Sequence, residues 1–250
     1  MVVNISQNEL EEFRMRLAEA RREASPLLAR RDYSMVLEWA KTHVEAGESS
    51  SQVVEIASSA LADLAAMEAD AQKRLKLRYE AITLCRKVLN ATFSANTAVS
   101  LANRVVDLFY DRFVSKGPLR MQALLADTLR ALERGINFNQ NKFTSAELLT
   151  QKSSVLRCQG LISTRQIQIA RISEAVQSAK KASELAPDFY FTYLELGQAL
   201  WNSARWASAD DRYASALNGA ERSLFKAQVA HEALPRLVLA ACRRDKHNYN

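Results

Sequence analysis

Residues 190–217 have the sequence YFTYLELGQALWNSARWASADDRYASAL, and their spacing decides the fold class of the chain. Large apolar side chains recur three or four residues apart at Tyr193, Leu196 and Leu200, which is the spacing of one face of an α-helix. Gly197 leaves a space beside that face because it has no side chain. The pattern therefore predicts a helix with one apolar face.

The full pattern of this stretch resembles a tetratricopeptide repeat. The matching order is Tyr193-x-x-Leu196-Gly197-x-x-Leu200, then Ala204-x-Trp206-x-x-Ala209-x-x-x-Tyr213-x-x-Ala216-Leu217. The resemblance covers residues 165–235 best and implies stacked helical hairpins, each about 34 residues long. Pro187 falls where the second helix of a preceding repeat should end. That repeat's first helix matches poorly, because Gln159, Ile162 and Ser163 occupy its signature positions.

Composition extends the all-helical prediction to the whole chain. Six glycines and four prolines among 250 residues are too few to form the turns of a many-stranded sheet. We predict an all-α fold of stacked antiparallel hairpins, a tetratricopeptide-like α-solenoid of about eleven to thirteen helices. Residues 1–140 should form helical hairpins, either as diverged repeats or as a different bundle. Residues 141–250 should form the repeat-like region. Its last helix, through Phe225, Ala227, Ala230 and Leu234, should be a capping helix, because Pro235 interrupts where the next turn would be. The Asn-rich segment 136–143 is the expected boundary.

Capping residues predict several helix ends. Ser6 followed by Glu9 has the spacing of a capping box, so a helix should begin there. Asp32 is the expected N-cap of the helix that follows it. Pro118 and Gly135 should frame another helix, since proline favours the first turn and glycine favours the position after the last.

Cysteine and histidine usage disfavours metal binding and secretion. Cys85, Cys158 and Cys242 are far apart, lie in apolar contexts and lack CxxC spacing, so we expect buried, reduced thiols. The histidines are equally scattered: His43, His231 and His247. No basic stretch followed by an apolar run opens the chain, and no window of about 18 apolar residues occurs, so we expect a cytoplasmic protein without a membrane span.

Enzyme motifs are missing from the sequence. It contains no GxxxxGK[ST], GxGxxG, HExxH or GxSxG pattern, and few glycines are left to wrap a phosphate. Adjacent carboxylates such as Asp210 and Asp211 point about 100° apart on a helix and do not converge on one substrate. We therefore predict a non-catalytic protein without a cofactor.

The resemblance implies a partner-binding groove made by first helices. On the best-matching repeat the groove positions are Phe191, Leu194, Gln198, Trp201 and Asn202. Leu194 and Gln198 stand where the family's carboxylate clamp needs Lys and Asn, so a receptor for chaperone tails is not expected. The predicted function is an adaptor or scaffold subunit that binds a partner protein or peptide within a larger complex. For Phe191 and Trp201, packing on an adjacent helix is the alternative.

The charge distribution supports a second hypothesis. The net charge is +6, and residues 70–187 hold 19 Lys and Arg against 9 Asp and Glu. A basic surface attracts nucleic acid or an acidic protein surface. The candidate residues for an anionic partner are Lys73, Arg74, Lys76, Arg78, Lys180 and Lys181. Arg74 and Arg78 are one helical turn apart, as contacts along a phosphate backbone require, so nucleic-acid binding is the alternative function.

Overall fold

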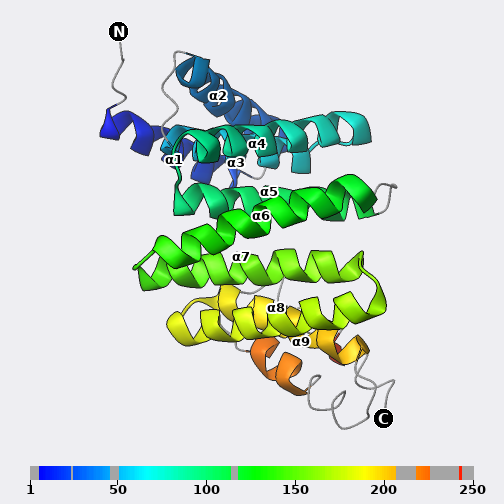
Figure 1. The fold of residues 1–250 in the computed structure, drawn as a ribbon. Helices are drawn as coiled ribbons and strands as arrows, with labels where there is room; N and C mark the ends of the chain where they lie inside the picture. The colour runs from blue at the N-terminus through cyan, green and yellow to red at the C-terminus, as the bar shows by residue number, and fades with distance from the viewer. Residues whose placement is uncertain are drawn as a thin grey trace. The chain divides into compact units, whose positions relative to one another are not determined.

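The computed structural model describes residues 6–23, 25–45, 51–113, 118–206, 218–225 and 242–243. These residues form helices α1 to α9, a further helical segment at 218–225 and no strand, so the all-α prediction is confirmed for them (Figure 1). The helices are α1 (Gln7–Ala20), α2 (Pro26–Glu45), α3 (Ser51–Ala66), α4 (Ala71–Ala91), α5 (Ala95–Phe113), α6 (Pro118–Phe138), α7 (Lys142–Leu161), α8 (Arg165–Leu185) and α9 (Tyr190–Trp206).

The chain divides into two compact units, Met1–Gly117 and Pro118–Asn250. In the first unit each helix packs on the next, and α3 also packs on both α1 and α5. In the second unit α6 to α9 pack in the same consecutive way, and α7 also contacts α9. Within each unit, consecutive helices thus pack as antiparallel hairpins and odd-numbered helices also contact one another, as in stacked hairpins. The boundary expected near residue 140 falls between α6 and α7, which pack on each other within the second unit.

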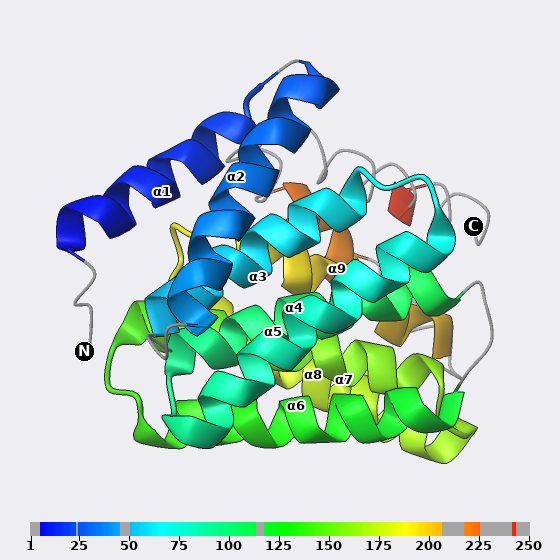
Figure 2. The same cartoon turned by 90° about the horizontal axis from the view of Figure 1, so that it is seen from above.

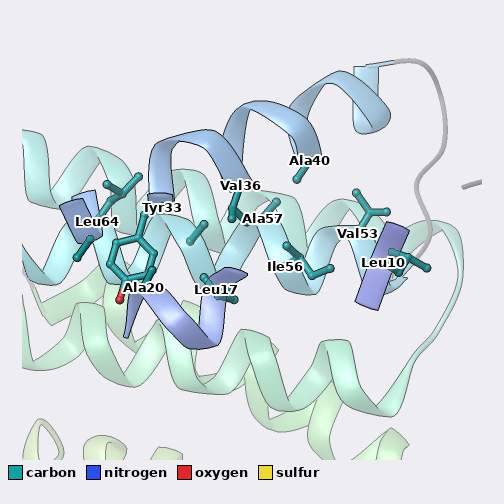
Figure 3. Close-up of a cluster of buried hydrophobic side chains, with 12 residues drawn as sticks. Leu10, Leu17, Ala20, Tyr33, Val36, Ala40, Val53, Ile56, Ala57 and Leu64 are labelled. Carbon is teal, nitrogen blue, oxygen red and sulfur yellow. The ribbon is translucent and has the colours of Figure 1, made fainter. Parts of the chain in front are cut away.

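One hydrophobic core cluster of the first unit lies between α1, α2 and α3. Figure 3 shows side chains from these three helices pointing into a common interior. Tyr33, Val36 and Ala40 of α2 are buried there, and the buried face continues back to Ala29. Because this face continues past Asp32, α2 is continuous from Pro26 to Glu45, and the prediction that Asp32 caps a helix is wrong.

The predicted N-terminus of α1 is confirmed. The Ser6 hydroxyl accepts a hydrogen bond from the backbone N–H of Glu9 at 3.2 Å. The Glu9 carboxylate accepts from Trp39 Nε1 at 2.8 Å, so it ties α1 to α2. The Trp39 indole also stacks on Phe13, with ring centroids 4.0 Å apart.

The sequence predicted that a helix ends at Gly135, but α6 does not end there. The helix continues to Phe138, and a Cβ atom on Gly135 would lie 2.8 Å from Leu148 Cδ2 of α7. The glycine is therefore a point of close helix approach. The loop after α6 is shorter than predicted, because Asn141 caps α7 by accepting from the backbone N–H groups of Phe143 and Thr144.

The spacing of the hairpins differs from that of the resembled family. The odd-numbered helices begin at Gln7, Ser51, Ala95, Lys142 and Tyr190, which is every 44 to 48 residues. A tetratricopeptide repeat has a period of about 34 residues. Gln159 consequently lies in the last turn of α7, and Ile162 and Ser163 lie in the turn that follows, so they do not belong to a first helix as the 34-residue alignment placed them.

Gly197 lies close to the segment 218–225. A Cβ atom on Gly197 would lie 3.2 Å from the Leu224 backbone nitrogen and closer still to its Cγ atom. The three cysteines are buried, as predicted. Several residues of the predicted pattern lie outside the described residues: Ala209, Tyr213, Ala216, Leu217 and Pro235.

Candidate protein-binding surface

The predicted groove residues of α9 have different environments. Phe191 is 48% exposed, but Leu194 is only 6% exposed and belongs to a buried cluster with Ala204 and Leu224. The half-buried Trp201 packs against the same cluster. Leu194 therefore contributes to packing rather than to a surface, because segment 218–225 covers this side of α9.

The two polar groove residues are engaged in the fold. Gln198 Oε1 accepts from Arg157 Nη2 at 2.7 Å, and Asn202 Nδ2 donates to the Gln198 carbonyl oxygen at 2.9 Å. Of the five residues predicted from the resemblance, Phe191 alone is exposed. The structure thus brings these residues onto one helix but does not place them on one surface.

A buried charged cluster joins α7 and α9, and sequence reasoning missed it. Arg157 Nε donates to Glu195 Oε1 at 2.7 Å, and Arg157 Nη2 donates to Oε2 at 2.8 Å. The hydroxyls of Ser153 and Ser154 donate to the same carboxylate, each at 2.7 Å. The one available signal was an arginine on a helix between apolar neighbours, which has to find a partner if it is buried.

This cluster has a structural role in the geometry described. Both charged side chains are buried, and both carboxylate oxygens of Glu195 accept two hydrogen bonds. A carboxylate that is fully engaged in this way is poorly placed to exchange a proton with a substrate. Removal of one member of a buried pair leaves the other charge uncompensated, at a cost of about 3–5 kcal/mol.

Four exposed phenylalanines lie at one end of the second unit, and we call them the aromatic end. Phe138 and Phe143 flank the turn between α6 and α7 and are 77% and 67% exposed. Phe189 and Phe191 flank the start of α9 and are 40% and 48% exposed. Figure 1 shows the α6–α7 turn and the α8–α9 turn at the same end of this unit, and Figure 2 agrees.

Helix lengths explain why these residues share an end. Helices α7 and α8 contain 20 and 21 residues, so α8 returns the chain to the level at which α7 began. Phe143 and Phe191 are each the second residue of their helices, α7 and α9, which pack together. The Phe191 ring also lies against Tyr190, with centroids 4.0 Å apart. Sequence reasoning identified only Phe191, although three further aromatic residues at helix ends were visible.

The predicted anionic-partner site divides into inward and outward residues. Arg78 is buried and donates to Asp111 Oδ2 at 2.9 Å and to Asp107 Oδ2 at 3.0 Å. Arg74 donates to the Glu68 carbonyl oxygen at 2.7 Å and lies 3.7 Å from Asp111. The stripe expected from Arg74 and Arg78 is therefore turned into the fold. The four lysines of the prediction are exposed: Lys73, Lys76, Lys180 and Lys181.

The buried Arg78 faces one carboxyl group, that of Asp107, whose pKa is changed by burial. Burial raises the pKa of Asp107, while the guanidinium groups of Arg78 and Arg104 oppose that rise. Arg104 Nη2 in turn donates to the Ser59 hydroxyl at 3.2 Å. These groups hold α3, α4 and α5 together, and so the positive charge of Arg78 is compensated inside the unit.

No protein-family model matches this chain, and no curated protein matches it. Within the described ranges, no three His, Cys, Asp or Glu side chains gather in a way that could hold a metal ion. None of the helices in those ranges is long and apolar enough to cross a membrane. We therefore infer function from the geometry of the aromatic end and of the charged surfaces.

Proposed function

We propose that this chain is a non-catalytic adaptor or scaffold subunit that binds a partner protein through the aromatic end of its second unit. The observation that carries the proposal is the exposure of Phe138, Phe143, Phe189 and Phe191 at one end of a stack of hairpins. Clustered exposed apolar side chains mark interaction sites. Covering a phenylalanine ring fully contributes up to about 3 kcal/mol, and aromatic anchors are enriched among interface hot spots.

The resemblance of residues 190–217 to a tetratricopeptide repeat supports a protein partner. That family binds extended peptides or helices, and Phe191 belongs both to the groove that the family implies and to the aromatic end. The proposed surface differs from that groove in the other residues, because Leu194 is buried and Gln198 is bonded to Arg157. The described charged clusters, around Glu195 and around Arg78, tie helices together, which supports a role without catalysis.

The proposal is tested by quantitative affinity purification with matched variants. The test variant carries Phe143→Ser and Phe191→Ser. The control carries Ile167→Ser and Ile169→Ser, which replaces two exposed apolar residues at the first turns of α8, at the opposite end of the unit. We expect a protein partner that is retained by the unaltered chain and by the control and lost from the test variant.

Two further measurements make the result decisive. Circular dichroism and thermal melts of both variants should match the unaltered chain, because all four replaced side chains are exposed. The captured partner, purified separately, should bind the control and not the test variant in direct titration. If the test variant retains every partner that the unaltered chain retains, the aromatic end is not the binding surface.

A further inference from the structure

The aromatic end of the second unit is balanced in charge. Segments 133–147 and 180–191, which carry its phenylalanines, together hold four basic and four acidic residues, and all eight are exposed. The second unit as a whole holds 18 basic and 12 acidic residues. The positive excess of the unit therefore lies elsewhere, and the charge of the aromatic end favours neither an acidic nor a basic partner.

Two halves of similar composition make up this end. In the first half, the exposed Lys142 precedes Phe143 at the start of α7. In the second half, the exposed Asp188 precedes Phe189 in the turn before α9. Among the residues that the structure describes, neither Lys142 nor Asp188 forms an ion pair. Each half thus offers an aromatic contact beside an available charge, and the two charges have opposite signs.

A surface of this kind is complementary to itself. In a two-fold symmetric dimer, a residue i that contacts residue j of the other copy does so twice, because j of the first copy also contacts i of the second. The Lys142 half of each copy can therefore meet the Asp188 half of the other, with opposite charges facing each other in both places. A partner surface of one sign would match one half and repel the other.

The exposed aromatic area has the size that a dimer needs. The exposed fractions of the four phenylalanines together exceed that of two fully exposed phenylalanine residues. At about 200 Å² for each such residue, the rings present more than about 400 Å². A stable interface buries about 800 Å² on each partner, and homodimer interfaces are about two-thirds apolar. The exposed Asn137, Gln140 and Asn141 supply polar groups for the rim of such an interface.

We propose that the aromatic end joins two copies of this chain in a two-fold symmetric dimer. The phenylalanines of both copies form its apolar centre, and Lys142 of each copy pairs with Asp188 of the other. This inference rests on the proposed function, because it names the partner protein that the aromatic end binds. The charge balance and the ring area carry it, since both fit a second copy of the same surface.

The test is charge reversal, measured by sedimentation equilibrium of the purified full-length chain. The unaltered chain should associate reversibly to twice its mass of 28.0 kDa. Lys142→Glu and Asp188→Lys each bring like charges together at two places, so each should raise the dissociation constant about tenfold or more. An equimolar mixture of the two variants should recover the dimer, because the mixed dimer again pairs opposite charges at both contacts.

A matched control and a ring variant locate the contact. Arg165→Glu reverses an exposed cation at the opposite end of the unit and should dimerise like the unaltered chain. The variant with Phe143→Ser and Phe191→Ser should raise the dissociation constant about 100-fold or more, because each lost ring is counted twice. Circular dichroism checks that every variant is folded.

Three results would overturn the dimer. These are an unaltered chain that stays monomeric at every concentration, a mixture of the charge-reversed variants that stays monomeric, and a dimer that survives loss of Phe143 and Phe191. The proposed function is separable from this outcome. If the purified chain is monomeric but still captures a different protein that the Phe143→Ser and Phe191→Ser variant loses, the dimer is wrong and the proposed function stands.

Discussion

Glu55 of α3 carries a carboxyl group whose protonation is coupled to folding. Burial raises its pKa above the ordinary value, while Arg14 and a hydrogen bond from Thr97 Oγ1 at 3.4 Å partly oppose that rise. The folded chain therefore binds this proton more tightly than the unfolded chain does. The resulting stabilisation is fully present below the unfolded-state pKa and is lost as pH rises through the folded-state pKa.

Glu55→Gln should remove this pH dependence. The variant should gain melting temperature relative to the unaltered chain as pH rises from about 4 to about 7, because the glutamine never ionises. Thermal melts over this range check the expectation, with Glu11→Gln as a control at an exposed carboxyl of α1. A difference in melting temperature that stays constant with pH would mean that Glu55 ionises equally easily in the folded and unfolded chains.

At the residue scale, sequence predicted burial better than it predicted which polar groups turn inward. The buried cysteines and the buried alanines of α8 followed from apolar periodicity. Arg78 and Glu195 were not predictable in the same way, because their partners come from other helices: Asp107 and Asp111 of α5 for the arginine, Arg157 of α7 for the glutamate. Pairings between distant residues depend on packing that local patterns do not encode.

At the element scale, the buried Arg157–Glu195 pair links α7 to α9. Arg157→Met should lower the free energy of unfolding by about 3–5 kcal/mol, because Glu195 is left buried without its counter-charge. Adding Glu195→Met should recover much of that loss, since two apolar side chains replace two charges. Urea denaturation of the single and double variants measures both effects, and a loss below about 1 kcal/mol in the single variant would contradict them.

Helix ends show where local preference loses to packing. Ser6 begins α1 as its capping pattern predicted. Asp32 and Gly135 also suggested helix ends, yet both lie within continuous helices. In each case a buried apolar face continues past the residue. Extending that face stabilises the fold more than ending the helix at a local cap would. The missing side chain of Gly135 leaves room for Leu148 of α7 and does not serve a turn.

At the scale of the whole molecule, the all-α class was predictable from composition, but the repeat length was not. The tetratricopeptide-like positions cluster in residues 190–217, and the helices before them lack that signature. Their period of 44 to 48 residues comes from helices mostly of 19 to 21 residues. Apolar periodicity indicates that such helices exist, but it is equally compatible with hairpins of several lengths.

The division into two units has a direct test. Fragments 1–117 and 118–250, produced separately, should each be helical and unfold cooperatively, because each unit has its own buried apolar residues. Fragments cut at residue 140 instead should be less stable, since that cut separates α6 from α7. Circular dichroism with urea denaturation compares the two pairs, and equal stability of both pairs would argue against the boundary at Gly117.

The inward and outward faces of α4 differ in how strongly folding constrains their evolution. Inward residues such as Arg78 and Ile82 are constrained by folding, because each is buried among neighbours from other helices. Outward lysines such as Lys73, Lys76 and Lys87 are exposed, so their replacement is nearly neutral for folding. Single substitutions can thus change the electrostatic potential of this face one charge at a time, while α4 keeps its packing.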